Sequence, residues 1–299
     1  MSSVNYAKGV VYAVFSSATF GLIPLFSIPL LAIGLSIQTI ICYRFLFATV
    51  MMVCVVILTD RDVKLRLKQL FVISLLSILY ALTSILLLES YQVMPSGIAT
   101  TIHFLYPLAV TLIMSWFFGE RSTGVVYLAI ALSLGGVMLL AWGSHTGGDF
   151  HRGVALAIST VITYALYIIG VMKSSACKVD PVVLTLYVLG MGTVIFFIYA
   201  FATTGIEPIR SFVAWRDMIM LALVCTVISG FTLVLAIKHI GSTMTSILGS
   251  MEPLTALIIG VVYFGEHFDI SSIAGVILII FAVVLVIIQG GRNRAIEKQ

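Results

Sequence analysis

The clearest shortage in this 299-residue chain is charge. Asp, Glu, Lys and Arg make up 9% of the residues, whereas they make up roughly a quarter of a soluble domain. Hydrophobic residues make up 61%, so the polar side chains are too few to cover the surface of a water-soluble fold. The composition therefore excludes an ordinary soluble domain and indicates an integral membrane protein.

Cysteine pairs and catalytic motifs are also missing from the sequence. The four cysteines form no CxxC pair, which argues against a disulfide framework and against a metal cage. The chain contains no HExxH, no GxSxG, no paired carboxylates and no glycine-rich loop of the kind that binds phosphate. We therefore expect that the protein is not an enzyme and holds neither a cofactor nor a metal.

Long apolar runs are abundant instead. They recur along the whole chain with lengths of about 20 residues, which is what a helix needs to span the hydrocarbon core of a bilayer. The runs are continuous and rich in Leu, Ile, Val and Ala, unlike the alternating strands of a membrane β-barrel. We predict an all-α integral membrane protein with ten transmembrane helices, at 9–33, 36–58, 69–89, 95–118, 123–142, 153–172, 181–204, 215–237, 243–264 and 270–289.

Lys and Arg are shared unevenly between the two sides that these spans define. If both termini lie in the cytoplasm, twelve of these residues lie on the cytoplasmic side, whereas Arg152, Arg210 and Arg216 lie outside and Arg44 lies within a span. This distribution follows the positive-inside rule. We expect a multi-pass protein of the cell inner (cytoplasmic) membrane. The net charge of +4 then reflects topology and contact with the lipid bilayer, and predicts no nucleic-acid partner.

Two stretches of the sequence resemble each other. FLYPLAVTLIMSWFFGE (104–120) aligns with SMEPLTALIIGVVYFGE (250–266) at an offset of 146 residues, and earlier in each half the offset is 144. We therefore predict two five-helix halves, residues 1–145 and 146–299. Because five is odd, the second half enters the membrane from the opposite side. Inverted repeats of this kind place a site near the midplane between the halves, which favours a transporter over a membrane enzyme.

Three motifs of the sequence also resemble those of a known family. YRFLFA (43–48), YPLAVTLIMSWFFGER (106–121) and EPLTALIIGVVYFGE (252–266) resemble the drug/metabolite transporter (DMT) superfamily, and within it the EamA branch. The resemblance implies a ten-helix fold of two inverted repeats around a central cavity that opens to one side at a time. It also implies transport of small metabolites, with exporters of amino acids among the members. The four-helix relatives carry a coupling Glu in their first helix, but residues 13–26 contain no acid here.

Hydroxyl, amide and aromatic residues at helical spacing mark the helix faces that turn away from lipid. On this criterion the predicted substrate cavity is lined by Thr19, Phe20, Tyr80, Thr83, His103, Tyr106, Thr160, Tyr164, Tyr167, Ser229 and Glu252. Small polar residues also join helices within bilayers, so packing is the alternative for each Ser and Thr. The tyrosines and His103 are too bulky for close helix contacts and favour a cavity wall, although a lone His can also be structural.

Four residues are expected to act as buried charges or gates: Arg44, Glu252, Pro107 and Pro253. Arg44 either binds a substrate carboxylate or has a structural role, in which it pairs with helix-end carbonyls or with Glu252. Its place in a general family motif favours the structural role. Glu252 is the counterpart of Tyr106 in the repeat and is expected near the midplane. Three roles stay open for it: proton coupling, binding of a substrate ammonium, or accepting a hydrogen bond beside the Pro253 kink. The two prolines are expected to free backbone carbonyls.

The sequence thus predicts a transporter, preferably an exporter, of small organic metabolites such as amino acids, working by alternating access. A cavity of aromatic and hydroxyl groups suits such solutes, whereas nucleotide sugars would require several Arg or Lys residues within the spans. The alternative is a flippase for lipids or lipid-linked substrates, which would need a basic rim, and few basic residues are expected on the outer side. We expect a monomer rather than a homodimer.

Overall fold

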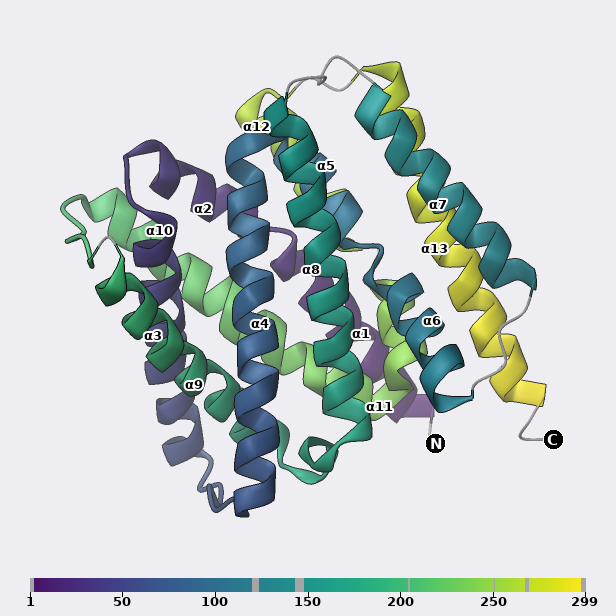
Figure 1. Ribbon diagram of the computed structural model, residues 1–299. Helices are drawn as coiled ribbons and strands as arrows, with labels where there is room; N and C mark the ends of the chain where they lie inside the picture. The colour runs from purple at the N-terminus through teal and green to yellow at the C-terminus, as the bar shows by residue number, and fades with distance from the viewer. Residues whose placement is uncertain are drawn as a thin grey trace.

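The computed structural model describes residues 3–119, 124–142, 148–203, 205–249, 251–266 and 269–296. Within these ranges the protein contains helices and no β-strand, so the predicted all-α class is confirmed for this part of the chain. In chain order the elements are α1 (Ser3–Phe20), α2 (Ile23–Ala32), α3 (Ile37–Leu58), α4 (Leu67–Val93), α5 (Ser96–His103), α6 (Tyr106–Phe118), α7 (Gly124–Trp142), α8 (Gly148–Lys173), the 3₁₀ turn η1 (Ser175–Lys178), α9 (Pro181–Ala202), α10 (Phe212–Ala222), the π-helical turn η2 (Leu223–Ile228), α11 (Ser229–Leu248), α12 (Met251–Phe264) and α13 (Ile270–Ile296), as shown in Figure 1.

Seven helical stretches among the described residues are long and apolar enough to cross a membrane. They are Ala7–Ala32, Ile37–Leu58, Leu67–Val93, Ser96–Phe118, Asp149–Lys173, Pro181–Ala202 and Phe212–Ile240. Three shorter apolar helices, Tyr127–Gly136, Met251–Phe264 and Ile273–Ala282, lie within the other predicted spans. The start of α1 and the end of α13 lie toward the same end of the molecule (Figure 1). The total of ten spans and the orientation in the membrane stay predictions.

Two of the predicted spans are each divided into two helices. α1 and α2 are separated at residues 21–22, and α5 and α6 are separated at residues 104–105. Pro24 and Pro107 lie in the first turns of α2 and α6, where a missing N–H costs little. The same residues cannot continue a helix from the preceding turn, because a proline supplies no N–H to the carbonyl four residues earlier. The expected kink near Pro107 therefore takes the form of a complete break.

One predicted boundary is wrong. The apolar pattern predicts that one span ends at residue 237 and the next begins at 243, but α11 continues to Leu248. The helix at the corresponding place in the predicted first half is α4. It ends at Val93, because Met94 is extended (φ −152°, ψ 160°) and Pro95 follows it. The residue 146 positions after Pro95 is Gly241, which keeps its N–H. A helix can therefore pass through this position in the second half and not in the first.

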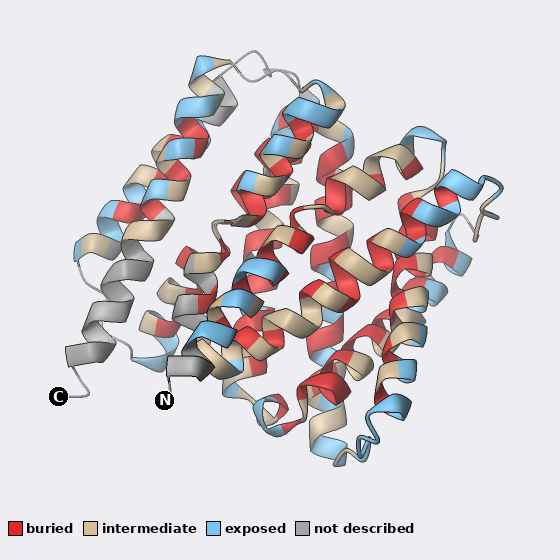
Figure 2. Cartoon of the chain, turned by 180° about the vertical axis from the view of Figure 1, so that it is seen from behind, coloured by how far each residue is buried: buried red, intermediate tan, exposed pale blue. Residues whose placement is uncertain are grey.

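Packing between helices places the core along the middle of the molecule. α3 packs on α9, α4 on α8, α1 on α11, and α7 on α13, and Figure 1 shows the last pair together at one edge. Buried residues gather on the sides of helices that face one another, as Figure 2 shows. Large apolar side chains such as Phe117, Phe201 and Phe212 are exposed on the outside, where lipid would surround them.

Two helices that pack on each other, α3 and α9, share an offset with the predicted sequence repeat. α3 (Ile37–Leu58) and α9 (Pro181–Ala202) each have 22 residues, and their starts are 144 positions apart. The hydroxyl oxygens of Thr49 and Thr193, which are also 144 positions apart, lie 2.9 Å from each other. Gly119 and Gly265, 146 positions apart, directly follow α6 and α12 with φ values of 69° and 64°. Two pairs of positions that the predicted repeat aligns thus agree with it: the glycines share a backbone conformation, and the threonines contact each other.

The packing of α3 on α9 leads to a stability prediction. Phe45 is fully buried, and its ring centroid lies 4.7 Å from that of Phe196. Replacing it in Phe45→Ala removes these contacts and leaves a cavity, which should cost about 2–5 kcal/mol. The unfolding temperature in detergent should fall, and it can be followed with a thiol-reactive dye because Cys42 and Cys225 are buried and free. Phe212→Ala, at an exposed position, is the control, and an equal effect of both substitutions would contradict the packing described.

Candidate functional site

Aromatic side chains from four helices meet in the interior. Phe20 ends α1, His103 ends α5, Tyr106 begins α6, and Tyr164 lies in the middle of α8. The ring centroids of Tyr106 and Tyr164 are 4.8 Å apart, and those of His103 and Tyr164 are 5.1 Å apart. Phe20 stacks on both His103 and Tyr164 at 6.2 Å. The helix breaks at residues 21–22 and 104–105 thus lie directly beside this cluster.

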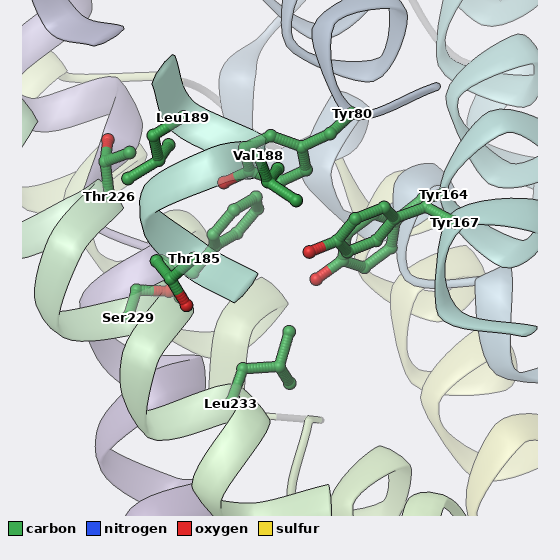
Figure 3. Close-up of a pocket in the computed structure, with 11 residues that line it drawn as sticks. Tyr80, Tyr164, Tyr167, Thr185, Val188, Leu189, Thr226, Ser229 and Leu233 are labelled. Atoms are coloured by element: carbon green, nitrogen blue, oxygen red, sulfur yellow. The ribbon is translucent and has the colours of Figure 1, made fainter. Parts of the chain in front are cut away.

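Two small pockets border the aromatic cluster. The first is lined by Phe20, Tyr80, Tyr164, Tyr167, Thr185, Val188, Leu189, Thr226, Ser229, Gly230 and Leu233 (Figure 3). The second is lined by Ala13, Ser16, Ser17, Phe20, Tyr106, Tyr164, Ser229, Leu233, Thr245, Gly249 and Glu252. Each has a cavity volume of about 20 Å³, which is room for about one water molecule. These two pockets are therefore nearly filled by the side chains that line them.

The two pockets are neighbours because they share four lining residues, namely Phe20, Tyr164, Ser229 and Leu233. In Figure 3 the hydroxyls of Tyr164 and Tyr167 point from α8 toward the side of the first pocket that carries Thr185 and Ser229. Hydrogen-bonding groups and aromatic faces therefore line the same space.

The structure brings together most of the predicted cavity residues. Phe20, Tyr80, Tyr106, Tyr164, Tyr167, Ser229 and Glu252 line one pocket or both. The other four lie outside the two linings: Thr19 donates to the carbonyl of Phe15 at 2.7 Å, Thr83 bonds with Thr163 at 2.7 Å, and His103 bonds with Thr160 at 2.8 Å. The hydrogen bonds of these four residues are made within their own helix or to a side chain of a neighbouring helix. A role in transport stays a prediction for all eleven residues.

One side-chain atom of His103 and one of Glu252 face each other without a hydrogen-bond partner. The His103 side chain is fully buried, and Glu252 is 3% exposed. His103 Nε2 and Glu252 Oε1 are 3.8 Å apart, which is too long for a hydrogen bond, and neither atom has another hydrogen-bond partner. Buried polar atoms without partners are rare in proteins because their desolvation is costly. Packing alone does not explain this pair.

The hydrogen bond of Thr160 fixes which nitrogen of His103 carries a proton. The single hydroxyl hydrogen of Thr160 is donated to the carbonyl of Ala157. Thr160 can then only accept at its contact with His103 Nδ1, so Nδ1 is the donor. In the neutral imidazole this leaves an unprotonated Nε2, whose lone pair faces Glu252. The tautomer is thus assigned by the hydrogen-bond network.

The buried cation lies at the other side of the site. Arg44 is 1% exposed, and its Nε donates to Thr226 Oγ1 at 2.6 Å. Thr226 lies in the π-helical turn η2 and donates in turn to the carbonyl of Leu221 at 3.0 Å, five residues earlier. Thr226 lines the first pocket, so the guanidinium lies one side chain behind that wall. π-Helical turns of this kind occur often at functional sites.

Gly21 was not among the predicted residues, yet it touches the site directly. A Cβ atom at Gly21 would lie 2.5 Å from the carbonyl oxygen of Glu252 and 2.8 Å from Cβ of Thr255. The bend between α1 and α2 can therefore approach α12 only because this residue has no side chain. Close to it, the Ser17 hydroxyl donates to the carbonyl of Gly249 at 2.7 Å. No local sequence pattern indicates this contact, because it depends on tertiary packing.

Two carboxylates bind helix N-termini at the end of the molecule away from the start of α1 (Figure 1). Glu266 accepts hydrogen bonds from the backbone N–H and the hydroxyl of Ser96, at 2.9 and 2.7 Å, where α5 begins. Glu207 accepts from the N–H of Ser36 at 2.7 Å, where α3 begins. A carboxylate at a helix N-terminus accepts hydrogen bonds from N–H groups that have no partner within the helix. Its negative charge also interacts favourably with the helix dipole. These contacts join segments that are far apart in the sequence at this end of the molecule.

The contact at Gly21 leads to a second prediction. Gly21→Ala should push α12 away from the bend and lower the free energy of unfolding by about 1–3 kcal/mol, because the new methyl group would meet the backbone of Glu252. Thermal unfolding in detergent measures this effect. Gly135→Ala is the matched control, since its Cβ would make an ordinary 3.7 Å contact with Leu278. A Gly21→Ala protein as stable as the control would show that the close approach is absent.

Comparison with known proteins agrees with this geometry. The model of the EamA-like transporter family matches the chain twice, over residues 7–142 and 151–288. A curated relative, the uncharacterized transporter YvbV of Bacillus subtilis (strain 168), is 25% identical over 238 residues, which are 78% of this chain and 77% of that protein. A solved structure whose title reads only "Crystal structure of protein" superposes with a TM-score of 0.69 at 13% identity. It covers 98% of this chain and 99% of its own, and it shows a shared fold. The chain belongs to the EamA-like transporter family.

Proposed function

We propose that this membrane transporter exports small organic metabolites, amino acids among them, by alternating access through a cavity formed from the two pockets. One observation carries the proposal: an interior lined by aromatic rings and hydroxyls has a buried carboxyl group, Glu252, at one end and a buried guanidinium, Arg44, behind the other. Export is the direction that the resemblance to amino-acid exporters implies.

An amino acid matches this arrangement of charge. Its ammonium group can bind near Glu252, and its carboxylate can lie on the side of Arg44 and Thr226. Its side chain would lie against the rings of Phe20 and Tyr164, which border both pockets. Aromatic rings with hydroxyls combine apolar contact area with hydrogen bonding, as amphipathic solutes require. Nucleotide sugars fit poorly, because within the seven long spans the interior offers one buried Arg and no cluster of cations.

Alternating access requires two related halves, for which the structure gives support. We propose the halves 1–145 and 146–299, ten spans and both termini in the cytoplasm of a cell with an inner membrane. The two family matches, over 7–142 and 151–288, support this division. Contact between the equivalent residues Thr49 and Thr193 is expected where a two-fold axis in the membrane plane passes between α3 and α9.

The carboxylates at the helix N-termini suggest how one end opens. Glu266 and Ser96 belong to different proposed halves, as do Glu207 and Ser36. Movement of the halves that opened this end would break both contacts. In the proposed orientation this end faces outward, so the conformation described is closed to the outside. The pocket volumes of about 20 Å³ further indicate that a substrate enters only after the helices separate.

The proposed substrate class can be tested by transport. Proteoliposomes that contain the full chain, whatever its oligomeric state, should take up labelled amino acids and should not take up nucleotide sugars. Transport by Glu252→Gln should be at least about tenfold slower, because the uncharged amide loses its ion pair with the substrate ammonium. Glu266→Gln keeps the acceptor oxygen that binds Ser96 and should be milder. Glu120→Gln, outside the described residues, is a further control expected to be mild.

Two outcomes would contradict the proposal. Movement of a fluorescent short-chain lipid between leaflets, without amino-acid transport, would identify a flippase of the same fold. Transport restricted to nucleotide sugars would overturn the substrate class while leaving the membership of the transporter family intact.

A further inference from the structure

We propose that the hydroxyl groups of Tyr164 and Tyr167 form a carboxylate site, in which each donates a hydrogen bond to one carboxylate oxygen of the substrate. The proposal rests on the transport function above and names the residues that bind one end of the amino acid. It starts from the first pocket, where both tyrosines lie in the wall and both come from α8.

The phenol groups of the first pocket have no hydrogen-bond partner among the described residues. Tyr80, Tyr164 and Tyr167 are each more than nine-tenths buried, yet none of their hydroxyl groups makes a hydrogen bond there. Tyr91 is buried to a similar degree and bonds with Thr100 at 3.0 Å, as buried tyrosines usually do. The three oxygens without partners are not fully enclosed, so a molecule in the pocket can reach them.

The threonine hydroxyls of the same pocket are already used as donors. Thr185 donates to the carbonyl of Pro181 at 2.8 Å, and Thr226 donates to the carbonyl of Leu221 at 3.0 Å. Each of these oxygens can therefore only accept a hydrogen bond from a molecule in the pocket. The phenols differ, because their hydrogens have no acceptor among the described residues. The wall of the first pocket thus has unused donors and fits a molecule that brings acceptor atoms.

The two hydroxyl groups from α8 lie side by side. Tyr164 and Tyr167 are three residues apart, which places them on the same face of the helix. Their rings are nearly parallel, with 16° between the planes and 5.9 Å between the centroids, and in Figure 3 both hydroxyls point the same way. A carboxylate has two oxygens, and each can accept a charge-assisted O–H···O bond of about 2.6 Å. Two parallel donors at this spacing can therefore reach both oxygens of one carboxylate.

Packing against other aromatic rings fixes this arrangement. Tyr164 contacts Tyr106, with 4.8 Å between the ring centroids, and Phe20 stacks on it from α1. Tyr167 contacts Tyr80 on α4, with 5.2 Å between the centroids. Side chains that are already ordered lose little conformational entropy when a ligand binds. The two donors are therefore in place before the substrate arrives.

The charge behind the pocket wall favours an anion over a neutral acceptor. Arg44 is buried and donates through Nε to Thr226, which lines the pocket. No carboxylate of the described residues lies within ion-pair distance of its guanidinium. A buried cation without a counter-ion is costly, and an anion bound on the other side of Thr226 lowers that cost. A carboxylate brings the single negative charge that balances one guanidinium.

This assignment predicts which part of the substrate determines binding in the first pocket. The primary amide of an amino acid keeps its ammonium group, its side chain and nearly its size. It loses the negative charge and one of the two acceptor oxygens. Such an amide should therefore be a poor ligand, even though its ammonium group can still bind near Glu252 in the second pocket.

The test measures how tightly the full chain binds two ligands, by isothermal titration. The first ligand is whichever of the standard amino acids wild-type proteoliposomes take up fastest, and the second is its primary amide. The wild type should bind the amino acid at least about tenfold more tightly, because hydrogen bonds to a charged acceptor are the stronger ones. In Tyr164→Phe/Tyr167→Phe this preference should fall below about threefold, mainly through weaker binding of the amino acid.

Two matched controls remove a phenol hydroxyl elsewhere. Tyr91→Phe removes a buried hydroxyl outside both pocket linings, and Tyr263→Phe removes an exposed one. Both variants should keep the preference of the wild type for the amino acid. A structural role of Tyr164 and Tyr167 would instead weaken the binding of both ligands equally in the double variant, and this result would contradict the proposal.

The outcomes separate this inference from the proposed function. A double variant that keeps the full preference for the amino acid would overturn the carboxylate site and leave the transport function standing. Equal binding of the amino acid and its amide to the wild type would also overturn it, and this measurement does not depend on the folding of a variant. If the wild type takes up no amino acid, the proposed function fails, and the carboxylate site fails with it.

Discussion

The absence of water within the hydrocarbon core determines most of this structure. Every buried polar atom must find its partner inside the protein, so the described residues form helices, whose backbone bonds are internal. Hydroxyl side chains follow the same constraint. Ser27, Ser77 and Ser84 each donate to the carbonyl four residues earlier in their own helix, at 2.8 to 3.0 Å. These hydroxyls are satisfied without help from a neighbouring helix and therefore do not report a site.

Exceptions to this rule gather around one place. The breaks at residues 21–22 and 104–105 and the π-helical turn η2 supply side chains that line the pockets or lie against them. Four buried side-chain atoms among the described residues have no hydrogen-bond partner, and two of them, His103 Nε2 and Glu252 Oε1, lie there as well, whereas Ser133 Oγ and Ser175 Oγ lie outside the two pocket linings. Interrupted helices are tolerated at membrane depth where they border a cavity, because freed backbone groups need polar surroundings. The coincidence of breaks and unpartnered atoms is the strongest structural sign of function.

The parts of the fold that depend on local sequence were predictable. The ends of α3 and α9 lie within two residues of the predicted spans, because apolar length and turn residues determine them. A kink at Pro107 was predicted, and the structure has a full break of the helix just before this residue. The continuation of α11 through Gly241 was not predicted. Dividing the chain into spans of membrane length assumes that polar residues such as Lys238 mark the end of a span. Lys238 instead remains in the helix and donates to the carbonyl of Val179.

The candidate site was predictable only in part, for a physical reason. Tyr106, Tyr164 and Glu252 stood out because bulky polar groups are rare in apolar helices. Val188 and Leu189 line the first pocket but resemble residues that face lipid. The bond from His103 to Thr160, which sets the tautomer, joins residues 57 positions apart and depends on tertiary packing.

The central claim is that Glu252 borders the space that receives the substrate and pairs with its ammonium group. Isothermal titration of the purified protein with a transported amino acid measures this most directly. The wild type should bind the amino acid at least about tenfold more tightly than Glu252→Gln does. Equal affinity of the two proteins would contradict the claim.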